Sequence, residues 1–333
     1  MQRTMGSRAW VWGLALVILM TAGAAWGQQE EGEGGDPYMD PTMAPLIVPT
    51  ADEFPPAPAP DAAVGADKSM MGVGVGGYFE VTGDQKAGLL TPSYRFSPAF
   101  VLKARVPLIF ERTLHYWGTE ASAGGLGDVV LDAEYARPLS APGSIVRLQL
   151  SAKLPTGDEE KMDGIYAVPL GTGTLDLIGR AQYARSTPTH GLLASLLYRK
   201  NTPNETITDL GGGDTRTFEV TGADQIVATV FGRKLVGAKW WLNLGLGATL
   251  LGDGKSKTTW SDGTPSTESD LGMGGTLVDL YPGVGYALGS LSPFLGLRVP
   301  VMTDYDNEFA DDERDVAVVF QFSWRPTRLV EGE

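Results

Sequence analysis

The feature that most constrains this fold is a ladder of twelve segments with alternating polar and apolar side chains, running from about Met70 to Arg325. The connections between the segments alternate in length. Short ones are Ala136–Gly143, Arg185–Gly191, Leu235–Lys239 and Leu288–Pro293, and long ones are Glu111–Gly125, Pro155–Thr172, Asn201–Gly222 and Gly252–Gly272. Successive connections of a closed barrel fall on opposite rims, so one rim should carry tight turns and the other long loops. That asymmetry is typical of bacterial outer-membrane barrels.

The two faces of the segments differ in polarity. In Ile145–Leu154, apolar Val146, Leu148 and Leu150 alternate with Arg147 and Gln149, and period-two alternation places each set on one face of a sheet. A soluble β-sandwich alternates in the same way. Two features favour a membrane barrel: full charges in mid-strand, and aromatic residues near the short connections, as in a membrane interface. These aromatic residues are Phe100, Tyr135, Tyr183, Trp240, Tyr286 and Trp324.

We therefore predict an all-β fold, a transmembrane up-and-down antiparallel β-barrel of about 12 strands over residues 68–326, in the bacterial outer membrane. Residues 1–27 combine Arg3 and Arg8 with a short apolar run and small residues, which predicts a cleaved signal peptide; a retained signal anchor is the alternative. Residues 327–333 form a C-terminal tail. With an even number of strands, both ends of the barrel lie on the tight-turn side, which we expect to be periplasmic.

The segment 28–67 should be a disordered leader. It holds eight prolines and nine acidic residues with no Lys or Arg, and so carries −9 of the formal charge of −14. Such a stretch cannot bury enough apolar surface to fold. It could serve as a periplasmic tether, or as a segment that enters the barrel mouth or docks a periplasmic partner through Pro41–Pro49.

The polar face of the strands defines the candidate lining of the barrel interior. Asp132 and Glu134 lie on the segment beside Arg147, so cross-strand charge pairs are expected. Two interpretations are open: a structural network that props a nearly closed barrel, or a polar lining past which a solute moves. Small inward positions on the first strand (Gly72, Gly74 and Gly76) and on the tenth (Gly283 and Gly285) are expected to leave free volume on one side, where Tyr78 and Tyr281 could stack against a flat ring. The candidate lumen residues are Lys103, Arg105, Asp128, Asp132, Glu134, Arg147, Lys153, Asp176, Arg180, Asp279, Tyr281 and Arg298.

Three short motifs occur in the order found in one known family: Ser93–Pro98, Gly125–Asp128 and Leu154–Asp158. In these motifs the chain resembles the outer-membrane family labelled as a component of the phenol-degradation meta pathway, or simply as a transporter. The resemblance covers roughly Ser69–Arg325. It implies an outer-membrane barrel that passes small, often apolar or aromatic compounds. Outer-membrane barrels usually end on an aromatic residue that the assembly machinery recognises, whereas here Trp324 is followed by nine further residues.

Other function classes find little support in the sequence. There is no cysteine for a thiol nucleophile or thiolate metal site, and the two histidines, His115 and His190, lie in connections. We predict no enzyme, no cofactor and no metal site, although a His115–carboxylate pair is a conceivable third alternative. The acidic balance argues against nucleic-acid binding.

The predicted function is a narrow or gated channel for small molecules, including apolar or aromatic ones. The predicted partners are the lipid bilayer with its lipopolysaccharide, the small-molecule permeant and the outer-membrane assembly machinery. The alternative is a structural or receptor-like barrel, without transport, that uses its extracellular loops and a periplasmic partner.

Overall fold

The computed structural model describes residues 72–116, 119–158, 161–211, 214–237, 239–261, 264–270, 274–288, 291–305 and 314–324. The predicted signal peptide, leader and C-terminal tail lie outside these residues. In the described part, no helix is long and apolar enough to cross a membrane.

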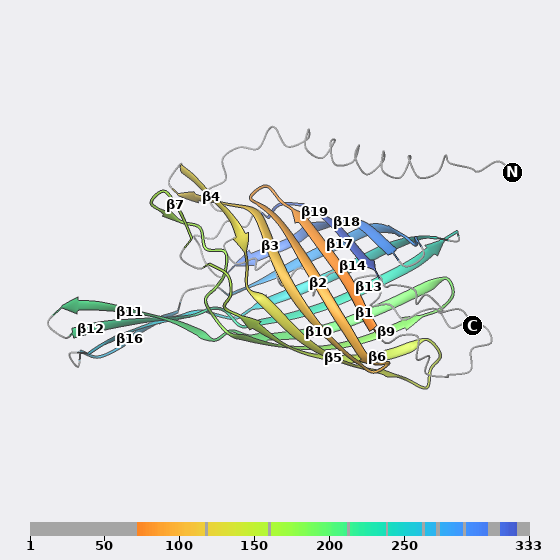
Figure 1. Cartoon of the computed structure of the whole chain (residues 1–333), viewed down its shortest axis with the longest axis horizontal. Coiled ribbons are helices and arrows are strands. Elements are labelled where there is room, and N and C mark those ends of the chain that lie inside the picture. The colour runs from red at the N-terminus through yellow and green to blue at the C-terminus, as the bar shows by residue number, and fades with distance from the viewer. Residues whose placement is uncertain are drawn as a thin grey trace.

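Twelve antiparallel strands close into one barrel, which confirms the predicted fold and strand number (Figure 1). Each strand pairs with its sequence neighbours in the barrel, and β19 closes the ring against β1 through a register that includes Phe79 opposite Phe320. The barrel strands are β1 (Gly72–Val81), β2 (Gln85–Ser97), β3 (Phe100–Tyr116), β5 (Val129–Pro138), β6 (Ser144–Leu154), β9 (Asp176–Ser186), β10 (His190–Lys200), β13 (Gln225–Val236), β14 (Trp240–Leu251), β17 (Gly275–Tyr286), β18 (Leu291–Tyr305) and β19 (Ala317–Trp324).

The two rims differ as the sequence predicts. The tight-turn rim joins β2 to β3, β5 to β6, β9 to β10, β13 to β14 and β17 to β18. In the β5–β6 turn, Gly143 adopts φ 71°, a left-handed conformation that side-chain-bearing residues rarely adopt. The opposite, long-loop rim carries the other connections, although the β1–β2 link, residues 82–84, is short. The start of β1 and the end of β19 both lie at the tight-turn rim, because Val75 pairs with Trp324.

The long connections contain more strand than the sequence suggested. β3 continues past the barrel and pairs with β4 (Thr119–Leu126), and β7 (Met162–Asp163) pairs with β8 (Tyr166–Ala167). Two separate connections combine into a four-stranded sheet of β11 (Pro203–Gly211), β12 (Asp214–Thr221), β15 (Lys255–Trp260) and β16 (Thr267–Asp270). In Figure 1, β11, β12 and β16 project from one end of the barrel. These segments are rich in Thr, which favours extended backbone, but they lack the apolar face by which we recognised the barrel strands.

The outward face of the barrel is apolar. Leu148, Leu150 and Leu244 are 54%, 65% and 58% exposed, whereas their polar neighbours along the strands point inward. The predicted aromatic residues lie near the tight-turn rim, where the rings of Trp240 and Tyr286 are 4.5 Å apart. An outer surface of exposed leucines differs from that of a water-soluble protein, whereas the interior combines the inward polar residues with a buried apolar cluster that includes Leu193, Leu197 and Phe231.

Candidate functional site

The barrel interior holds the residues that the sequence singled out. Eleven of the twelve candidate lumen residues are less than 10% exposed, and the remaining one, Lys103, has a side chain 19% exposed. They occupy the strand positions opposite the outward leucines, as alternation requires. Their common direction is therefore established, whereas their contact with a permeant stays a prediction.

A first ion network lies on β3, β5 and β6 and extends from the middle of the barrel toward the tight-turn rim. The Arg105 guanidinium donates two hydrogen bonds to the Asp132 carboxylate, at 2.9 Å from Nε and 2.8 Å from Nη2. Glu134 is shared by Lys103, at 2.8 Å, and Arg147, at 3.5 Å. Two carboxylates on β5 thus serve three cations on the neighbouring strands.

A second network lies nearer the long-loop rim and is more deeply buried. The Lys153 ammonium and the Arg199 guanidinium both lie 2.5 Å from Asp176, and Asp176 and the Lys153 side chain are fully buried. Lys153 also lies 3.7 Å from Asp128 and donates to the Thr172 hydroxyl. Two cations and two carboxylates balance here, so the network ties β5, β6, β9 and β10 together.

Two of the three motifs that carried the family resemblance, Gly125–Asp128 and Leu154–Asp158, lie beside this second network. The Asp128 carboxylate accepts hydrogen bonds from the backbone N–H groups of Gly157, at 2.9 Å, and Thr172, at 2.7 Å. The Val129 N–H donates to the Thr156 hydroxyl at 2.8 Å. A Cβ on Gly171 would lie 2.5 Å from an Asp128 oxygen, so only glycine fits there without a shift. These motifs fasten the β6–β9 connection to the barrel and do not by themselves define a ligand site.

A third network lies on the opposite wall. Arg298 on β18 pairs with Glu80 on β1 at 3.0 Å, and the Tyr78 hydroxyl donates to Glu80. On β17, the Tyr281 hydroxyl donates to Asp279 at 3.2 Å; Arg314, just before β19, also contacts Asp279, at 3.0 Å. The predicted residues Asp279, Tyr281 and Arg298 therefore lie together, across the barrel from the first two networks.

The expected free volume is absent at Gly283 and Gly285, where the prediction was wrong; on β1, by contrast, a Cβ at Gly72 would meet no atom within 4 Å, and one at Gly76 would make only ordinary contacts at 3.7 Å. A Cβ on Gly283 would lie 2.2 Å from the Phe294 ring, and one on Gly285 would lie 2.2 Å from the Trp241 ring. These two inward glycines on β17 accommodate aromatic rings from the neighbouring strands β14 and β18. Phe231 covers Gly245 in the same way, and its ring centroid is 5.6 Å from that of Tyr281.

The interior carries more positive than negative charge. On the described barrel strands, nine inward positions are cationic and five are anionic, a surplus of four positive charges. Asp128 and Arg314, just outside the strands, cancel one another. The cationic positions are Arg95, Lys103, Arg105, Arg147, Lys153, Arg180, Arg199, Arg233 and Arg298, and the anionic ones are Glu80, Asp132, Glu134, Asp176 and Asp279. Sequence reasoning missed Arg95 and Arg233, although strand alternation could have found both.

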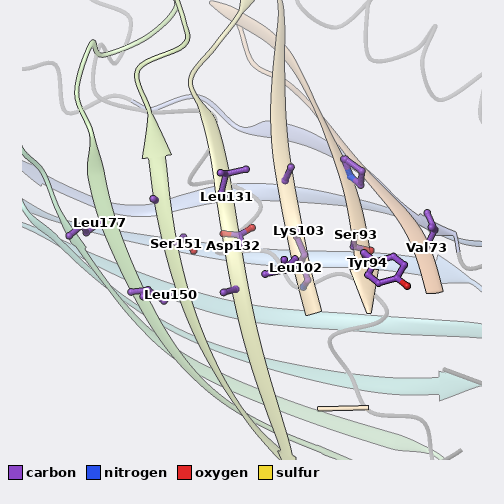
Figure 2. A pocket seen from close by; sticks show the side chains of 14 residues that line it. Val73, Ser93, Tyr94, Leu102, Lys103, Leu131, Asp132, Leu150, Ser151 and Leu177 are labelled. Atoms are coloured by element: carbon purple, nitrogen blue, oxygen red, sulfur yellow. The ribbon is translucent and has the colours of Figure 1, made fainter. Parts of the chain in front are cut away.

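A groove of about 650 Å³ lies on the outside of the barrel wall (Figure 2). Exposed Leu102, Leu131, Leu150 and Leu177 border it, together with small residues such as Ala133. Lys103 and Asp132 adjoin it only through their strands, because their side chains belong to the inward face. The groove is therefore a feature of the apolar outer surface and not an opening of the interior.

The structure describes the side chain of one of the two histidines, His190, whereas the side chain of His115 lies outside the described part. His190 is exposed in the β9–β10 turn, with Nδ1 2.8 Å from the Thr189 hydroxyl. His115 pairs through its backbone with Glu120 in the β3–β4 extension. No group of three or more metal-ligating side chains occurs among the described residues.

Comparison with solved structures identifies the class of fold. The COG4313 outer membrane channel from Pseudomonas putida F1 is similar at a TM-score of 0.54 and 16% identity, over 80% of this chain and 98% of that one. The NanC porin aligns at a TM-score of 0.46 and 9% identity, over 76% of this chain and 100% of that one. No protein-family model and no curated protein matches the sequence. The chain has the porin-like β-barrel fold of outer-membrane channels.

Proposed function

We propose that this protein is a narrow or gated channel that passes small molecules across the bacterial outer membrane. One observation carries the proposal: a closed barrel of twelve strands with an apolar outer face and a charged interior. Eight strands leave room only for side chains, whereas sixteen or more enclose a wide aqueous channel. Twelve strands suit a restricted path.

The proposed location follows from the two surfaces. The outward leucines would contact lipid acyl chains, and the aromatic residues near the tight-turn rim would lie at the periplasmic interface. The long-loop rim, with its four-stranded sheet, would face outward among lipopolysaccharide. Insertion would depend on the outer-membrane assembly machinery. Supporting this orientation, both ends of the barrel lie on the rim with tight turns.

The proposed permeants are small and include apolar or aromatic compounds, as the family resemblance implies. The inward rings of Phe231, Trp241, Tyr281 and Phe294 support this class, because aromatic rings pack favourably against one another. The proposed role is transport and not catalysis, and it needs no cofactor.

Conductance across a planar bilayer tests the proposal. Refolded protein should give discrete current steps, and the charge-removing changes Arg147→Gln and Asp132→Asn should each alter conductance or ion selectivity. An exposed charge on the outer face, Arg137→Gln, serves as the control and should leave the current unchanged. Absence of current from wild type and variants alike would contradict a conducting interior.

A structural or receptor-like barrel is the second candidate. The sheet of β11, β12, β15 and β16 favours it, because it presents a broad surface beyond the barrel. On this hypothesis, deletion of residues 203–221 and 255–270 would abolish the cellular phenotype of the protein, whereas the interior variants would not. The channel hypothesis predicts the opposite order of effects.

A further inference from the structure

The surplus of positive charge is confined to one half of the barrel interior. In the half near the long-loop rim, four inward cations are matched in number by four inward carboxylates: Lys153, Arg180, Arg199 and Arg298 against Asp132, Asp176, Asp279 and Glu80. Among the described residues, the whole surplus of four therefore lies in the half near the tight-turn rim.

On the described strands, five inward cations and one inward carboxylate, Glu134, lie in that tight-turn half, and Arg180 and Asp132 lie just beyond the middle of their strands. The cations Arg95, Lys103, Arg105 and Arg147 lie on β2, β3 and β6, Arg180 follows on β9, and Arg233 lies on β13. We call the five residues from Arg95 to Arg180 the basic wall. The carboxylates are Asp132 and Glu134, on β5 between β3 and β6.

Aromatic side chains lie on the other side of the same half. Four inward aromatic residues lie on β13, β14, β17 and β18, each no more than five residues from the tight-turn end of its strand: Phe231, Trp241, Tyr281 and Phe294. We call them the aromatic wall. The ring of strands places β14 and β17 about half a circumference away from β5 and β6. Arg233 joins the two walls, with its guanidinium 6.0 Å from the centroid of the Trp241 ring.

The two walls together match one class of small molecule. Guanidinium groups bind carboxylates through paired, charge-assisted hydrogen bonds. Aromatic side chains stack against flat rings. We propose that the pathway selects anions, and that its tight-turn half binds small aromatic carboxylates between the basic wall and the aromatic wall. This proposal rests on the proposed channel function.

The sign of this selectivity is opposite to that of the whole chain. The formal net charge is −14, which by itself would favour cations. Of this, −9 belongs to residues 28–67 and not to the barrel strands. Charges inside a low-dielectric wall act on a permeant more strongly than solvent-screened charges outside it. Anion preference is therefore a test of the interior and not of overall composition.

The first measurement is the reversal potential of refolded mature protein in a planar bilayer under a potassium chloride gradient. Wild type should favour chloride over potassium. Arg180→Gln should lower the permeability ratio about sevenfold, because in water one unit charge roughly 7 Å from the ion changes the chloride and potassium permeabilities about threefold each, in opposite directions. Arg137→Gln removes the same charge from the exposed outer face and should leave the ratio unchanged. The heat-dependent shift in gel mobility verifies that each variant is folded.

The second measurement uses three probes: benzoate, acetate and benzyl alcohol. Benzoate should reduce the chloride current at lower concentration than either acetate, which lacks the ring, or benzyl alcohol, which lacks the charge. Phe294→Leu should weaken the benzoate effect several-fold and preserve the chloride preference. Current with no preference, or with potassium preference, would overturn the inference and leave the channel function intact, as would equal effects of the three probes. Absence of any current would overturn the channel function and the inference with it.

Discussion

The two halves of the barrel interior contain the same kinds of charged residue in different proportions. Near the long-loop rim, Lys153, Arg199, Asp128 and Asp176 balance, and Asp128 is further held by two backbone N–H groups. Near the tight-turn rim, cations outnumber carboxylates, and Glu134 is divided between Lys103 and Arg147.

This difference separates charges that hold the fold from charges that can act on a solute. A buried cation balanced by a carboxylate contributes little field beyond the pair, and removing either partner leaves the other unpaired in a dry environment. A surplus of one sign leaves a net field that concentrates counter-ions. We therefore expect stability to depend mainly on the balanced half and selectivity on the other half.

The largest expected effect is on stability, from Asp176→Asn in the balanced half. Two buried cations, Lys153 and Arg199, would lose their shared carboxylate. The free energy of unfolding should fall by about 3–5 kcal/mol, the usual cost of breaking a buried ion pair. A guanidinium titration of the protein in lipid vesicles, followed by tryptophan fluorescence, measures this change.

Arg180→Gln provides the matched test in the basic wall. It removes one cation from among like-charged neighbours together with the interactions that the buried Arg180 makes, so the free energy of unfolding should fall by clearly less than for Asp176→Asn, by about 1 kcal/mol. If Arg180→Gln destabilised the barrel as much as Asp176→Asn, the division between charges that hold the fold and charges that act on a solute would be wrong.

A smaller effect on stability is expected from Gly245→Ala, beside Phe231 of the aromatic wall. The new Cβ would lie 2.1 Å from the Phe231 ring, so the ring must move, at a cost of about 1–3 kcal/mol. Gly179→Ala is the control, because a Cβ there meets no atom within 4 Å. Equal unfolding midpoints for the two variants would show that the ring does not depend on its glycine.

The smallest expected effect concerns Asp224, at the exposed long-loop rim. Partial burial raises the pKa of its carboxyl, but hydrogen bonds from Lys200, Tyr198 and the Asn201 backbone N–H lower the pKa further, so the net shift is downward. Because the folded-state pKa lies below the unfolded value of about 3.9, the carboxylate stabilises the fold above that pH. This stabilisation is lost as the pH falls through the folded-state pKa.

Asp224→Asn should therefore lower the free energy of unfolding at pH 7 by less than about 1 kcal/mol, as expected for a solvent-exposed ion pair. The difference from wild type should shrink below about pH 4. A difference that stayed constant over this range would mean that the charge of Asp224 contributes nothing.

The barrel could be predicted from the sequence because its strands carry two independent signals. Alternation such as Leu148–Gln149–Leu150 predicted which face of each strand is apolar. The unequal connections predicted which rim carries the tight turns and which carries the long loops. The strands beyond the barrel lacked the first signal. β11 and β12 pair with each other, and β12 pairs with β15, some forty residues further along. Nothing local in the Asn201–Gly222 connection indicates that partner.

The site was predicted in part. Alternation identified which charges point inward, since that depends only on strand parity. It could not identify which carboxylate each cation meets, because Arg105 reaches Asp132 diagonally and not its directly paired neighbour Val130. It also misjudged the inward glycines of β17, because whether a glycine leaves space depends on the ring of the next strand.

The sequence by itself determined that this chain forms a barrel, which face of each strand is apolar and which charges the interior contains. These properties follow from the two-residue period of a strand and require no knowledge of its neighbours. The tertiary structure alone decided how the charges divide into a balanced half and a positive half. It also decided that aromatic rings occupy the space beside Gly245, Gly283 and Gly285. Both depend on strand register and side-chain length, which become defined only when the twelve strands close.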